Sequence, residues 1–145
     1  MDERITKLKT PEECEKFAKN ATRLNRPDLA LEARRRAIEI RSEKYAAKSK
    51  IEKEAIKAIY AYEDILAEKN GRKTKATRTW QMIDRHGIIE AINRVVARRD
   101  DAMGYIMLKE RGMEDLSFEA VVLRHPDMFS QEAVQHAQAR IEKHT

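Results

Sequence analysis

The sequence contains little that would cross-link or interrupt the chain. It has a single cysteine, Cys14, so an intrachain disulfide is excluded, and a reducing compartment fits best. Only four glycines and three prolines occur in 145 residues, which favours long helices over many short strands. The N-terminal stretch MDERITKLKT lacks the apolar run of a secretory signal, and nothing approaches the roughly 20 apolar residues of a membrane span. We therefore expect a cytoplasmic protein, nucleoid-associated or otherwise intracellular, with no membrane partner.

Motifs of catalysis and metal binding are also missing. The four histidines are scattered without HExxH spacing, and one cysteine excludes a zinc finger. There is no Walker A run and no GxGxxG or GxSxG motif. Asp84, His86 and Glu90 lie close in sequence, but residues around a helix end often show this by chance. We expect no catalytic residue, no metal and no cofactor; an enzyme with an unrecognised helical active site stays a third hypothesis, for which the sequence gives no positive support.

Apolar residues recur at helical spacing along the chain, and capping signals divide it. Thr10-Pro11 and Ser49 begin helices with capping boxes, while Asn70-Gly71 and Gly87 end them. The first of these helices is expected to run to about Leu24, with Phe17, Ala21 and Leu24 on one face. The pattern predicts an all-α, compact bundle of about seven to eight helices, opening with an antiparallel helical hairpin and a long third helix. We expect one domain over 1–145, with possible subdomains 11–69 and 77–145 joined by a basic loop, 70–76.

Residues 11–41 resemble a single tetratricopeptide-like hairpin. Ala18, Ala30 and Ala37 stand at the spacing of that repeat's small residues, within RPDLALEARRRAIEI. The usual aromatic residues are missing, with Arg34 in place of one, and the chain holds no second copy. The resemblance therefore implies hairpin geometry and not membership of the family.

Positive charge is concentrated in the middle of the chain. The net charge is +5, yet residues 69–99 hold nine lysines and arginines against two acidic residues. Residues 1–68 are nearly balanced, with 16 basic and 14 acidic residues, and residues 100–145 are acidic, with five and nine. Residues 69–99 thus carry more than the whole net positive charge of the chain, and this favours a polyanionic partner.

The most informative stretch is residues 69–80, which we name the basic segment. It carries five positive charges and no negative one, and threonines between them can donate to phosphate oxygens. Thr77 and Thr79 lie at a helix start, where free N–H groups attract anions, and Trp80 can either stack on a base or hold the helix in the core. The sequence predicts nucleic-acid binding, DNA before RNA, through Arg72, Lys73, Lys75, Thr77, Arg78, Thr79, Trp80, Arg85, Arg94, Arg98 and Arg99.

Two alternatives remain open. Two helices flanking Gly87 suggest a helix-turn-helix, but Ile83 and Asn93 do not fit its usual pattern, so contacts from the loop and helix start are favoured. The chain could instead be a helical protein-interaction module that binds an acidic partner, or a homo-oligomer in which the acidic last third pairs with the basic middle.

Overall fold

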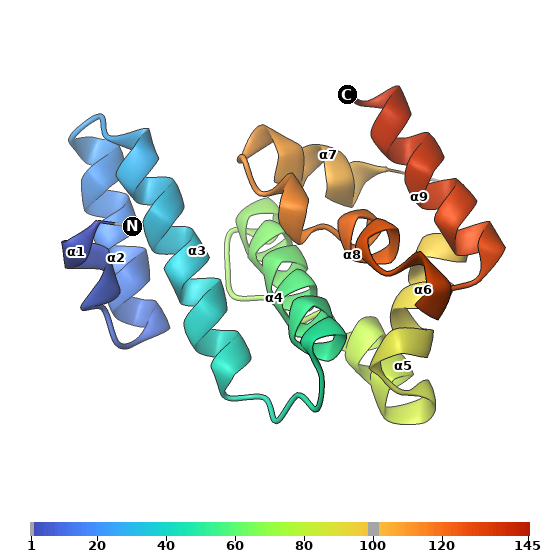
Figure 1. Cartoon of the computed structure of the whole chain (residues 1–145). Coiled ribbons are helices and arrows are strands. Elements are labelled where there is room, and N and C mark those ends of the chain that lie inside the picture. The colour runs from blue at the N-terminus through green and yellow to red at the C-terminus, as the bar shows by residue number, and fades with distance from the viewer. Residues whose placement is uncertain (1, 99–101) are drawn as a thin grey trace. The chain divides into compact units, whose positions relative to one another are not determined.

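The computed structural model describes residues 2–98 and 102–145, and every regular element in these ranges is a helix (Figure 1). The predicted all-α fold is confirmed, with nine α-helices and two short 3-10 helices in the described ranges. The chain divides into two compact units, Met1–Ala46 and Ala47–Thr145. The long third helix of the prediction is therefore grouped with the helices that follow it. Each unit is described by itself below.

The first unit is an antiparallel hairpin with a short helix beside it (Figure 1). It consists of α1 (Glu3–Thr6), α2 (Pro11–Arg23) and α3 (Pro27–Glu43). The alanines at tetratricopeptide-like spacing, Ala18, Ala30 and Ala37, are buried, as the hairpin requires. Leu24, expected on one face with Phe17 and Ala21, follows the last turn of α2 and is 68% exposed. The short α1, whose Ile5 is buried, was not expected from the sequence.

The second unit is built around the long helix α4 (Lys50–Asn70), which packs against α6, α7 and α8. The elements after it are α5 (Thr77–His86), α6 (Ile88–Arg98), α7 (Met103–Glu110), η1 (Glu114–Leu116), α8 (Phe118–Arg124), η2 (Pro126–Met128) and α9 (Gln131–Lys143). Helices α6 and α8 also pack against α9. The fully buried large side chains of this unit are Ile56, Ile59, Ile65, Ile92, Val96, Met113, Val121 and Val122.

Local signals in the sequence account for the helix ends. Thr10 and Ser49 accept hydrogen bonds from the backbone N–H groups of Glu13 and Glu52, as the capping boxes predicted. Ser130 caps α9 in the same way. No helix in the described ranges is long and apolar enough to cross a membrane.

Candidate nucleic-acid interface

The basic segment begins where α4 ends. Gly71 adopts a left-handed conformation (φ 69°), and the N–H of Arg72 donates to the carbonyl of Ala67 at 3.1 Å. This is a Schellman ending, in which a residue with a side chain would be strained. In the loop that follows, the Thr74 hydroxyl donates to the carbonyl of Arg72 at 3.0 Å and accepts from the Asn70 amide at 3.2 Å. The loop thus has a defined path.

The loop reaches α5 at a buried carboxylate on α4. Glu63 is 7% exposed, and its Oε2 accepts a hydrogen bond from the backbone N–H of Ala76 at 2.8 Å. The same oxygen accepts from the indole Nε1 of Trp80 at 2.7 Å. The Trp80 ring also packs at a tilt against Tyr60, with centroids 5.7 Å apart. Of the two roles considered for Trp80, the geometry therefore supports attachment of α5 to α4 over base stacking.

Exposure separates the predicted contact residues. Seven have exposed side chains: Arg72, Lys73, Lys75, Thr77, Arg78, Arg85 and Arg98. Thr79 is only 3% exposed, so we leave it out of the interface. Arg94 is half-buried and pairs with Glu90 at 3.1 Å, which offsets its charge. Arg99 lies outside the described residues.

The exposed cations of this surface differ from the arginines that pack between helices of the second unit. Arg72, Lys75, Arg78 and Arg85 make no ion pair with any residue in 2–98 or 102–145. Other arginines are paired with carboxylates across helices: Arg111 with Asp64 and Glu68, Arg124 with Glu54, and Arg140 with Glu119. The acidic last third therefore does not neutralise these four cations within the described chain.

The first turn of α5, like that of α7, differs from the helix starts that carry a side-chain cap. It has no side-chain cap and no acidic residue, and Ala76 stands at the N-cap. Serine or threonine caps α2, α4, α8 and α9, and each of these helices has a glutamate in its first turn. Arg78 and Arg85 lie seven residues apart, on one face of α5. The loop and the first turn thus place Lys75 and Arg78 near the uncapped end of α5, while Arg85 lies in its last turn.

A regular helix-turn-helix is not formed. Only Gly87 separates α5 from α6, whereas that motif joins its helices by a turn of about three or four residues. Most of one face of α6 is buried, through Ile88, Ala91, Ile92, Val95 and Val96. This helix therefore does not stand free to enter a groove of DNA.

Glu63 is the site residue that sequence reasoning missed. It lies seven residues after Ile56 and four after Ile59, both fully buried, so helical spacing places it on the same inward face. A carboxylate at such a position requires hydrogen-bond donors. That signal was present in the sequence, but the donors, which come from the loop and α5, were not readable from it.

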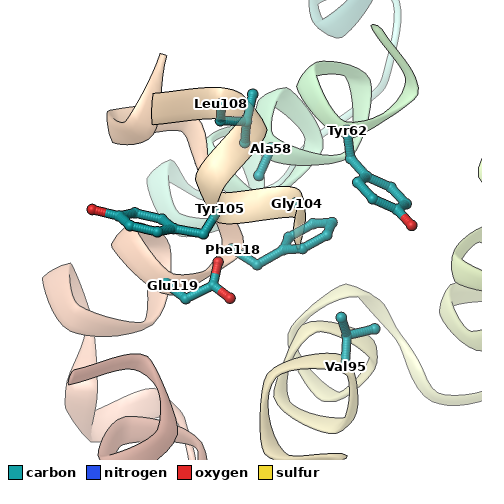
Figure 2. Close-up of a pocket in the computed structure, with 8 residues that line it drawn as sticks. All are labelled: Ala58, Tyr62, Val95, Gly104, Tyr105, Leu108, Phe118 and Glu119. Atoms are coloured by element: carbon teal, nitrogen blue, oxygen red, sulfur yellow. The ribbon is translucent and has the colours of Figure 1, made fainter. Parts of the chain in front are cut away.

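Two hollows lie in the second unit, and of the basic segment only Lys69 lines one of them. A cavity of about 20 Å³, with room for about one water molecule, is lined by Tyr62, Val95, Gly104, Tyr105, Phe118 and Glu119, among others (Figure 2). Burial raises the pKa of Tyr105 there, and Glu114 and Glu119 raise it further. A more open groove of about 230 Å³ runs between α4 and α7, with Lys69 at one end. Neither hollow contains a predicted contact residue.

The single cysteine of the sequence lies in the first unit. Cys14 is buried, and burial raises the pKa of its thiol, with Glu13 and Glu15 acting in the same direction against Arg36. In the described ranges no three histidine, cysteine or acidic side chains are grouped to hold a metal ion. Comparison with protein-family models, with curated proteins and with solved structures gives no match for this chain.

Proposed function

We propose that this chain binds nucleic acid, DNA before RNA, through the basic segment and the exposed face of α5. The observation that carries the proposal is the set of exposed cations Arg72, Lys75, Arg78 and Arg85, which pair with no carboxylate in the described chain. Cations that are not neutralised internally are the ones that gain most from phosphate contacts, because binding releases counterions from the nucleic acid.

The contacts expected from this surface are to phosphates and not to bases. In the part of the chain that the structure describes, α6 is not free to act as a recognition helix, and the single tryptophan is hydrogen-bonded to Glu63. Phosphate contacts position a protein on nucleic acid without reading its sequence. We therefore expect little sequence preference and a strong dependence on salt.

Fluorescence anisotropy with a labelled DNA duplex tests the proposal, with single-stranded DNA and RNA in parallel. The logarithm of affinity should fall linearly with the logarithm of salt concentration, with a slope of about −0.9 per phosphate neutralised. Replacing Arg72, Lys73, Lys75 and Arg78 together with alanine should abolish binding.

The control variant removes the same charge from the first unit. Lys9, Lys16, Lys19 and Arg23 are exposed, and their replacement with alanine lowers the net charge equally. Binding should survive in this variant. Equal affinity of the basic-segment variant and the parent would show that the segment is not the site. If no nucleic acid binds, the acidic protein partner becomes the favoured occupant of this surface.

A further inference from the structure

Glu63 is a buried carboxylate without a cationic partner. It makes no ion pair with a described residue, and both of its hydrogen bonds come from neutral N–H groups. Glu119, the other buried glutamate of this unit, pairs instead with Arg140. Burying a carboxylate is costly unless its bonds are satisfied. The two donors therefore must be held firmly for this arrangement to persist.

Those two donors bracket the first turn of α5. Ala76 is the last residue before the helix, and Trp80 lies one turn along it, so one oxygen atom fixes both ends of that turn. Tyr60, which lies about one turn before Glu63 on α4, also packs against the Trp80 ring. While Ala76 is buried and Trp80 half-buried, their neighbours Lys75 and Arg78 remain exposed.

Given the nucleic-acid binding proposed above, on which this step rests, we propose that Glu63 is the positioning residue of the basic segment. Its carboxylate holds the end of the loop and the first turn of α5 on α4, so that Lys75 and Arg78 are presented together before any ligand arrives. A preorganised site avoids the entropy cost of ordering side chains and loops on binding. Glu63 does not itself touch the ligand.

If Glu63 has this role, its two simplest substitutions should change polyanion affinity in different ways. Glu63→Gln keeps an acceptor oxygen in place and removes a negative charge from beneath the segment, so polyanion affinity should equal or exceed that of the parent. Glu63→Ala removes the acceptor and leaves two N–H groups without a partner. The segment then becomes ordered only on binding, and affinity should fall by about tenfold.

The test measures duplex binding over a range of salt concentrations for the parent, both Glu63 variants and Glu54→Ala. Glu54 is the matched control, because it lies on the same helix and contacts Arg124 and His125 instead of α5. Acrylamide quenching of Trp80 reports whether the contact has opened. For Glu63→Ala we expect stronger quenching, weaker binding and an unchanged salt slope, since every cation is retained. Glu54→Ala should match the parent in Trp80 quenching, in duplex affinity and in salt slope.

The outcomes separate this role from the proposed function. If Glu63→Ala folds, shows exposed Trp80 and still binds as the parent does, the positioning role is overturned while the basic segment stands. If the fourfold basic-segment variant also binds as the parent does, both are overturned. Should Glu63→Ala not fold, Trp80→Phe takes its place, because it keeps the ring and removes one donor. Parental affinity in that variant would likewise refute the role.

Discussion

The buried ion pair between α8 and α9 gives the sharpest prediction about stability. Arg140 Nη1 donates to Glu119 Oε2 at 3.0 Å, and each residue is only 8% exposed. Replacing one partner leaves the other charge buried and uncompensated, which costs about 3–5 kcal/mol. Replacing both with apolar residues of similar volume is often neutral or stabilising by about 1–4 kcal/mol. We therefore expect Glu119→Leu to be strongly destabilising and the double variant Glu119→Leu/Arg140→Met to recover most of the loss.

The geometry also ranks the two single variants. Glu119 lines the cavity in Figure 2, which has room for about one water molecule, so a carboxylate left by Arg140→Met can be hydrated there. Arg140 lines neither of the two hollows described above. We accordingly expect Arg140→Met to cost less than Glu119→Leu, with both losses large against a typical total stability of about 5–15 kcal/mol.

Urea denaturation followed by Trp80 emission measures these free energies within the second unit, because the chain's single tryptophan lies there. The four proteins form a double-mutant cycle, which isolates the coupling between the two charges. A double variant as unstable as the sum of the single losses would refute the reasoning, because it would show that the pair is not coupled. So would a Glu119→Leu protein within about 0.5 kcal/mol of the parent, the range of ordinary surface changes.

The other predictions concern single contacts on α4. Gly71→Ala should destabilise the second unit by about 1–2 kcal/mol in urea, because the left-handed conformation strains a side chain; an unchanged midpoint would contradict this. Ser49→Ala should cost about 1 kcal/mol through loss of the cap, and Ser49→Asp should restore it. Burial raises the pKa of Glu54, but hydrogen bonds from His125 and Arg124 outweigh it, so its pKa lies below 4.5, the ordinary value for a glutamate. The contribution of ionised Glu54 to the free energy of unfolding is thus present above pH 4.5 and is lost as the pH falls through its lower folded pKa. The stability difference between the parent and Glu54→Gln should therefore shrink in acid.

Features encoded locally were predictable from the sequence. Thr10, Ser49 and Ser130 cap helices because a hydroxyl can reach an N–H three residues ahead, and this needs no tertiary contact. Gly71 ends α4 for an equally local reason. The four-residue α1 escaped notice because it is too short to show a helical period.

Features that depend on tertiary packing were not predictable. The exposed state of Arg72 and Arg78 agrees with the expectation of a solvent-facing cluster. The inward direction of the Trp80 indole depends on a carboxylate seventeen residues earlier, and no local rule joins the two. Thr79 was assigned to the surface from its residue type, but the rotation of α5 that attaches Trp80 to α4 buries it.

The shared oxygen of Glu63 has a consequence for how this chain can change over generations. A phenylalanine at position 80 would remove one of the two hydrogen-bond donors, so an acceptor at position 63 would be less needed. An apolar residue at position 63 would instead leave the indole N–H of Trp80 without an acceptor. Either replacement alone would give a protein in which a buried polar group has lost a hydrogen-bond partner, and therefore a less stable one. In diverging copies of this chain the identities at positions 63 and 80 should therefore covary, and a residue with an acceptor oxygen at position 63 should accompany tryptophan at position 80.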